Sequence, residues 1–222
     1  MSMVASRPDP SNCIHVVSVG MFGRAVAKYL KTLFSNMQVT IWDGGDLSDC
    51  EQWPDCILHV LAAWRPVRSL CEFMDELSYE RGRPFIPLIL DSPVLRFGPV
   101  IVPNVSGCWH CWDMRLRQHT ISLRERSALL EFYETNPQSG PAGYLEPFAM
   151  IGAAQIARIT QSSMDRAAGQ IWQMNLFTRH VSTGRLVGID GCGRCGLSRP
   201  LEDRTYYEAK DSLSFLWTGH KT

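Results

Sequence analysis

The sequence predicts an α/β protein built on a mainly parallel sheet that is covered by helices on both faces. In the first half of the chain, apolar runs of strand length alternate with segments whose apolar residues recur at helical spacing. The first strand and the first helix are joined by a glycine-containing turn, and the second strand ends at an acidic residue. Alternation of this kind is typical of a Rossmann-like fold.

The first strand–helix–strand unit spans residues 13–43. Residues 14–19 are β-branched and apolar, which predicts a buried strand, and residues 20–23 (Gly-Met-Phe-Gly) predict a turn. Residues 24–34 form an amphipathic helical pattern, and a second strand over 38–42 ends at Asp43. This order is that of a dinucleotide-binding unit.

The alternation continues through a second unit and then changes character. We expect strands over 56–62 and 85–90, a helix over 67–79, and an edge strand or hairpin over 94–102. Further on we expect a helix plus loop over 112–126, a break over 136–143, a helix over 148–160, and strands over 170–177 and 185–189 around a turn at 182–184. The chain is thus interpreted as one domain, 13–200, with a disordered N-terminus, 1–12, and a tail, 201–222.

Two Cys-x-x-Cys motifs are the strongest chemical signal. Cys108 and Cys111 form one pair, and Cys192 and Cys195 form the other. Two such pairs can supply the closed tetrahedral Cys₄ shell of a structural zinc site, which predicts a zinc-braced hairpin at the C-terminal end of the domain. The alternatives are redox-active pairs, disfavoured because neither pair is expected to lead from a strand into a helix, and four unrelated buried thiols. His110, between two ligands, is interpreted as a bystander.

The glycine turn is a weaker signal. Gly20, Gly23 and Asp43 are the candidate cofactor-binding residues, because a glycine-rich turn approaches phosphate and the acid binds ribose. Ser18 stands where the first glycine of the full motif would be, so the alternative is that both glycines only let the helix pack on the sheet. His59 lies in an apolar strand and is interpreted as a core residue.

Composition excludes several classes of function. Lys plus Arg and Asp plus Glu both number 22, so the zero net charge indicates neither nucleic-acid nor membrane binding. No apolar run approaches the about 18 residues of a membrane span, and no signal peptide is visible, which predicts a cytoplasmic protein. In that compartment cysteines are expected as thiols or ligands rather than disulfides, so the remaining four are interpreted as packing residues: Cys13, Cys50, Cys56 and Cys71.

Taken together, these motifs resemble a known superfamily. The run from Val17 to Ala25 (Val-x-Val-Gly-x-x-Gly-Arg-Ala), the segment 98–103 (Gly-Pro-Val-Ile-Val-Pro) that leads to Cys108, and the final Cys-x-x-Cys-Gly resemble the ThiF-like, ubiquitin-activating-type superfamily. Within it, the chain is most similar to the "ocin-ThiF-like" cyclodehydratase branch, whose members are partners of YcaO enzymes that install azolines in ribosomally made peptides.

The resemblance implies a zinc tetrathiolate and a subunit that presents a precursor peptide to a YcaO-type enzyme. Catalytic members of the superfamily adenylate a carboxylate, whereas this chain has no lysine between Lys31 and Lys210 and an incomplete glycine motif. We therefore expect no catalytic residues and no ATP. The alternative is a divergent ATP-dependent adenylating enzyme acting on a peptide. The resemblance also implies a homodimer. Since the first strand begins near Ile14, no room is left for the winged-helix module that binds leader peptide in this branch, and a separate leader-binding protein is expected.

Overall fold

The computed structural model describes residues 13–44, 47, 53–141 and 143–196, so the predicted N-terminus 1–12 and tail 201–222 lie outside the described residues. A seven-stranded sheet forms the centre, in the order β2-β1-β3-β4-β5-β6-β7. The strands are β1 (Ile14–Val19), β2 (Met37–Ile41), β3 (Leu58–Ala63), β4 (Phe85–Asp91), β5 (Val94–Phe97), β6 (Gln170–Asn175) and β7 (Val181–Arg185). The pairings from β2 to β4 are parallel and those from β4 to β7 are antiparallel. The expectation of a mainly parallel sheet is therefore corrected to a mixed one.

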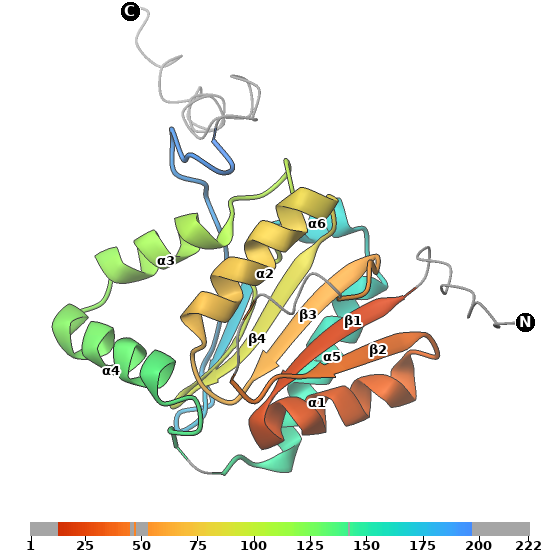
Figure 1. The fold of residues 1–222 in the computed structure, drawn as a ribbon, viewed down its shortest axis with the longest axis horizontal. Helices are drawn as coiled ribbons and strands as arrows, with labels where there is room; N and C mark the ends of the chain where they lie inside the picture. Colours follow the sequence, from red (N-terminus) through yellow and green to blue (C-terminus); the bar gives the residue numbers. More distant parts are fainter. Residues whose placement is uncertain (1–12, 45–46, 48–52, 142, 197–222) are drawn as a thin grey trace, which may run out of the picture.

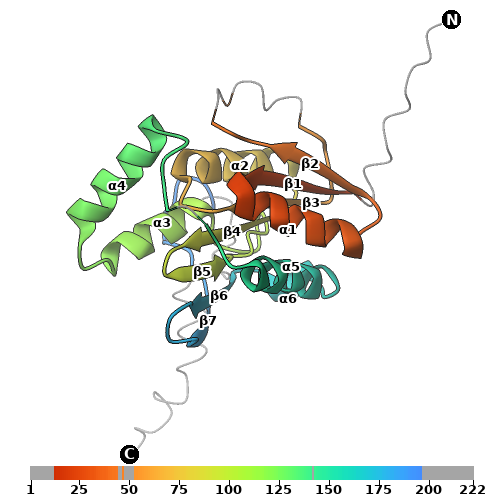
Figure 2. The same cartoon turned by 90° about the horizontal axis from the view of Figure 1, so that it is seen from below.

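Helices cover the two faces of this sheet in separate layers (Figures 1 and 2). On one face, α1 packs against α5, and their apolar side chains share a core with alternate residues of β1, β3, β4 and β5. On the other face, α2 packs over β3 and β4, and α3 lies against α2. The helices are α1 (Gly20–Leu33), α2 (Arg68–Arg81), α3 (Trp109–Gln118), α4 (Leu123–Thr135), α5 (Glu146–Thr160) and α6 (Met164–Ala167).

The glycines after β1 begin a helix rather than a separate turn, which corrects the expected boundary. Gly20 has φ +67° and is the first residue of α1, so the chain leaves the strand directly into the helix. A Cβ at Gly23 would lie 2.3 Å from the Ala62 carbonyl oxygen, so only glycine lets α1 approach β3 this closely.

The antiparallel half differs from the sequence expectation in two places. Residues 94–97 form an internal strand, β5, between β4 and β6, and not an edge. The hairpin turn lies at residues 176–180, and the segment expected as a turn, 182–184, is inside β7. The Asn175 carboxamide oxygen accepts hydrogen bonds of 3.0 Å from the backbone N–H groups of Phe177 and Thr178, which fixes the turn there.

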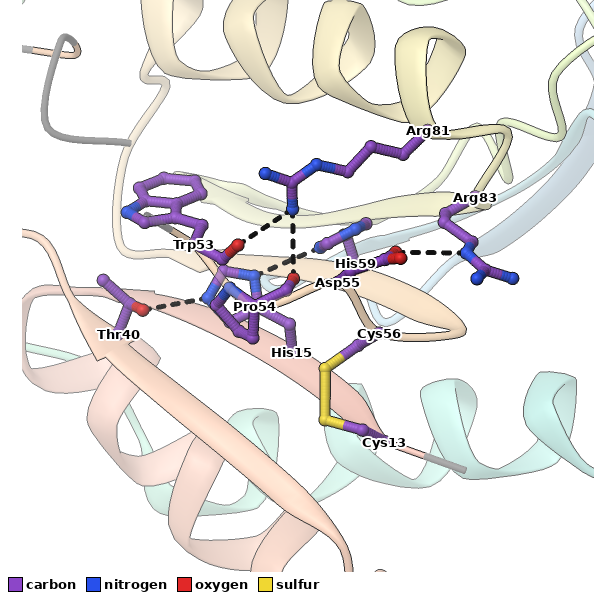
Figure 3. The surroundings of a disulfide bond; sticks show 10 residues. All are labelled: Cys13, His15, Thr40, Trp53, Pro54, Asp55, Cys56, His59, Arg81 and Arg83. Atoms are coloured by element: carbon purple, nitrogen blue, oxygen red, sulfur yellow. Dashed lines mark hydrogen bonds and ion pairs between the residues drawn. A yellow bond between two sulfur atoms is a disulfide. The ribbon is translucent and has the colours of Figure 1, made fainter. Parts of the chain in front are cut away.

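The structure also corrects the expectation about two cysteines (Figure 3). Cys13 and Cys56 form a disulfide, although they are 43 positions apart in the sequence. Cys13 lies directly before β1 and Cys56 lies two residues before β3, and these two strands are parallel neighbours in the sheet. Cys71 is a buried free thiol, as expected of a packing residue, and Cys50 lies outside the described residues.

His59 is a core residue, as expected, and it pairs with a second buried histidine. The Nδ1 atoms of His15 and His59 lie 3.1 Å apart, and His15 Nε2 is 2.9 Å from Thr40 Oγ1 (Figure 3). Burial lowers the pKa of His15 to about 3 and that of His59 to about 4. Both rings are therefore neutral near pH 7.

Within the described part of the chain, no helix has both the length and the apolar character needed to cross a membrane.

Candidate metal centre and nucleotide crevice

The four cysteines of the two Cys-x-x-Cys motifs converge in the structure. Their sulfur atoms all lie within 4.8 Å of one another, and all four residues are buried. Cys108 Sγ lies 3.6 Å from Cys192 Sγ and 3.8 Å from Cys111 Sγ, and Cys111 Sγ lies 3.4 Å from Cys195 Sγ. A tetrahedral zinc site with Zn–S bonds of about 2.3 Å has sulfurs about 3.8 Å apart. The cluster therefore has the dimensions and donor atoms to hold a metal ion.

Each pair is held by the local backbone. Cys108 precedes the first residue of α3 and Cys111 lies in its first turn, so both sulfurs project from one helix end. In the second pair, the Cys192 N–H donates to the Ile189 carbonyl at 3.1 Å, and the Gly196 N–H donates to the Cys192 carbonyl at 2.8 Å. A Cβ at Gly196 would lie 2.5 Å from the Cys192 nitrogen, so this turn requires glycine.

The first pair opens a helix, α3, but no strand leads into it, because β5 ends at Phe97 and the residues shortly before Cys108 form a turn. The expectation that neither pair leads from a strand into a helix is therefore confirmed for Cys108 and Cys111. The grouping of all four sulfurs is what favours metal binding over two independent thiol pairs. His110 is exposed and is not one of the grouped residues, in agreement with its interpretation as a bystander.

A buried carboxylate connects the two pairs, and the sequence analysis missed it. Asp75 on α2 has a fully buried side chain, and its Oδ1 accepts a 3.0 Å hydrogen bond from the Trp109 N–H beside Cys108. Its Oδ2 forms an ion pair with Arg194, which lies inside the second motif and also pairs with Glu76 at 3.1 Å. Burial raises the pKa of Asp75, and these donors oppose that rise. An acidic residue on the mainly apolar buried face of a helix is the signal that could have revealed this role.

The electrostatic surroundings of the four cysteines also favour metal binding. Hydrogen bonds from the thiols of Cys108 and Cys195 and then from the Ile189 N–H lower the pKa of Cys111, which favours its thiolate, the form that binds metals. A divalent ion with four thiolates carries a net charge of −2. The Arg194 guanidinium and the N-terminal end of α3 lie beside the four cysteines and would offset the charge of such a bound ion.

The candidate cofactor-binding residues lie at the carboxyl ends of β1 and β2, where Rossmann-like folds bind nucleotides. There, the ring of Trp64 lies against Gly20, and a Cβ at Gly20 would be 2.4 Å from Trp64 Cδ1. Gly23 faces β3, as described above. Both carboxylate oxygens of Asp43 accept hydrogen bonds of 3.2 Å from Arg24.

The segment that follows α4 lies over the same edge of the sheet. Pro137 packs against Gly44, and the Gln138 side chain donates to the Asp43 carbonyl at 2.6 Å. The buried Arg65, directly after the Trp64 that covers Gly20, donates to the carbonyl oxygens of Tyr133 at 3.2 Å and Pro137 at 2.8 Å. This part of the chain, residues 136–141, contains no helix or strand, in agreement with the break expected from the sequence.

Comparison with solved structures shows that the fold is shared with larger proteins. The heterocyclase TruD superposes with a TM-score of 0.60 at 19% identity over 84% of this chain and 28% of TruD. MccB of E. coli with SeMet MccA gives 0.59 at 14% identity over 84% of this chain and 67% of MccB. MccB with ATP gives 0.59 at 15% identity over 84% and 68%. The chain thus spans just over a quarter of TruD. No protein-family model matches the sequence, and no curated protein is significantly similar to it.

Proposed function

We propose that this chain is a non-catalytic, ThiF-like subunit of an azoline-forming cyclodehydratase complex, in which it acts with a YcaO-type enzyme on a ribosomal precursor peptide. It shares its fold with a part of the heterocyclase TruD and with most of MccB, which was solved with the peptide MccA. Those likenesses support a peptide as the substrate class. The motifs that resemble the "ocin-ThiF-like" branch support the more specific assignment.

The observation that carries the non-catalytic part of this proposal is the position of Trp64. Its ring lies against Gly20, at the strand end where a nucleotide phosphate would approach the backbone. Arg24 engages the Asp43 carboxylate, which would otherwise be available to a ribose. The lysine that catalytic members of the superfamily use on the transferring phosphate is also missing, because the chain has no lysine between Lys31 and Lys210. The nearby Arg24 and Arg65 instead bind Asp43 and backbone carbonyl groups.

In this proposal the four cysteines hold a structural zinc ion. The zinc would be structural, because a closed Cys₄ shell leaves no coordination position for substrate. Its binding would supply folding free energy, because the unfolded chain holds no preformed site. Cys108 and Cys111 would hold it from α3, and Cys192 and Cys195 from the segment after β7. Asp75 and Arg194 would position the two halves of the shell, so the zinc joins the middle of the chain to its C-terminal end.

The proposed partners are a YcaO-type enzyme, a precursor peptide, a separate leader-binding protein, and a second copy of the chain in a homodimer. Co-purification tests the first of these. The tagged chain should retain a YcaO-type cyclodehydratase encoded beside it, and Cys192→Ser should retain much less because the C-terminal segment loses its anchor. Failure of the wild-type chain to retain the enzyme at micromolar concentrations would contradict the assignment.

The second candidate is a divergent adenylating enzyme, favoured by the likeness to MccB with ATP. The two candidates differ in one measurable property. Calorimetric titration of the zinc-loaded protein with Mg²⁺-ATP should give no binding heat if the chain is non-catalytic. Saturable binding together with AMP release in the presence of a precursor peptide would instead establish the adenylating enzyme.

A further inference from the structure

We infer that the free edge of β7, together with the groove beside it, binds an acidic peptide in an extended conformation. β7 is the last strand of the sheet among the described residues, and all its residues are exposed. In Figure 2 the β6–β7 hairpin lies at the far end of the sheet from β2. This inference extends the proposed function, because it identifies a surface that would bind the peptide. It rests on the proposed function only for the identity of that peptide.

The backbone pairing shows which groups of β7 face outward. The Asn175 N–H donates to the His180 carbonyl at 2.9 Å, and the Leu186 N–H donates to the Gly169 carbonyl at 2.7 Å. Because antiparallel pairs alternate, residues 180, 182, 184 and 186 direct their backbone groups to β6. The N–H and C=O groups of Val181, Thr183 and Arg185 therefore point away from the sheet, and none has a hydrogen-bond partner among the described residues.

The side chains of two of these residues, Thr183 and Arg185, border a groove of about 530 Å³. Register places Phe97, Trp172 and Thr183 in one row across β5, β6 and β7, and all three line this groove. A peptide that pairs with the outward groups of β7 would direct alternate side chains to the same face. The partly exposed Trp172 would supply apolar contact, as in other strand-addition sites, whereas Phe97 is buried beneath the groove.

Charge identifies the kind of peptide. Arg158 from α5 and Arg185 from β7 line the groove, and neither forms an ion pair with a described carboxylate. The Arg158 Nε donates to Gln155 at 3.1 Å, and Arg185 donates to the Arg166 carbonyl at 2.9 Å, so both guanidinium groups keep further donors free. Two such arginines beside a row of backbone donors and acceptors fit an extended peptide with acidic side chains.

The edge is tested with a fluorescein-labelled peptide of alternating threonine and glutamate, by fluorescence anisotropy on the zinc-loaded full chain. Thr183→Pro removes an outward N–H and leaves the pairing with β6 intact, because prolines are tolerated at edges. We expect it to weaken binding about tenfold or more, whereas Thr183→Val should bind within about twofold of wild type. Equal binding by Thr183→Pro, with unchanged far-UV circular dichroism, would overturn the inference.

The charge requirement is tested independently of the edge. The double variant Arg158→Gln/Arg185→Gln should weaken binding about tenfold at low salt and flatten its salt dependence. Arg124→Gln, on the exposed surface of α4, is the matched control and should bind as wild type does. A probe with lysine in place of glutamate should not bind, and binding of both probes alike would overturn the charge assignment.

Hydrogen exchange distinguishes other occupants of the edge. In the free chain, the amides of Val181, Thr183 and Arg185 should exchange quickly and become protected by the acidic probe. Protection that rises with protein concentration would assign the edge to a second copy, and protection at every concentration would assign it to the chain's own remaining residues. Either result would overturn the peptide site. If Thr183→Pro loses probe binding but cyclisation proceeds without the chain, the peptide site is supported. Only the proposed function is then refuted.

Discussion

Replacement of Asp75 by asparagine should weaken zinc binding without removing any zinc ligand. Asn keeps an acceptor for the Trp109 N–H but loses the charge opposite Arg194. Breaking a buried ion pair costs about 3–5 kcal/mol, and the cost here is smaller because Arg194 is 27% exposed and retains Glu76. We expect about 2 kcal/mol, which corresponds to roughly 30-fold weaker zinc binding and lies within the usual range for residues outside the ligand shell.

The assay is competition for zinc with a chelator of known affinity, followed at neutral pH under reducing conditions. Asp113→Asn is a matched control, because Asp113 is a mostly buried acid on α3 that pairs with Arg68 at 3.2 Å and Arg117 at 3.0 Å. It should lower the thermal midpoint and leave zinc affinity within about twofold of wild type. Equal zinc affinity in Asp75→Asn and wild type would refute the bridging role of Asp75.

Three further predictions concern the metal, the buried histidines and the disulfide. Cys192→Ser should reduce bound zinc from one ion per chain to well below one by elemental analysis and expose residues after β7 to proteolysis; a fully loaded variant would contradict the Cys₄ shell. The pKa values of His15 and His59 are lowered to about 3 and about 4, so below pH 6.5 the unfolded chain binds more protons than the folded chain. The free energy of unfolding should therefore be highest above pH 6.5 and fall as the pH drops toward 4. His59→Leu should remove on the order of 3 kcal/mol of this pH dependence in urea titrations, and an unchanged slope would disprove the neutral pair. Cys13→Ser should lower the free energy of unfolding by about 2–4 kcal/mol under oxidising conditions only, and an equal loss with excess reductant would argue against the Cys13–Cys56 bond.

The features that could be predicted from sequence are those with a local pattern. The β-branched run of β1 and the small apolar residues of α5 have the expected periodicity and form the expected elements. The Cys-x-x-Cys spacing likewise identified four residues that the fold brings within 4.8 Å of one another. Within β1, α5 and each Cys-x-x-Cys pair, neighbouring residues in the chain define the local geometry. The two pairs are 84 residues apart, so their convergence depends on the tertiary structure, and the sequence indicated it only because one closed shell needs four ligands.

The features that were missed depend on contacts between distant segments. Asp75 and Arg194 are 119 residues apart, and only the packing of α2 against the cysteine cluster joins them. The Cys13–Cys56 bond follows from the adjacency of β1 and β3, which no spacing rule contains. The place of Trp64 against Gly20 depends in the same way on two neighbouring strand ends.

We propose that the chain contributes to azoline formation without performing the chemistry itself. The most direct test is a reconstituted reaction containing the YcaO-type enzyme, ATP, a leader-binding protein and the precursor peptide, with loss of water from the peptide followed by mass spectrometry. Ring formation should depend on this chain, persist in Asp43→Asn, and fall sharply in Cys192→Ser. Equal ring formation with and without the chain would contradict the account.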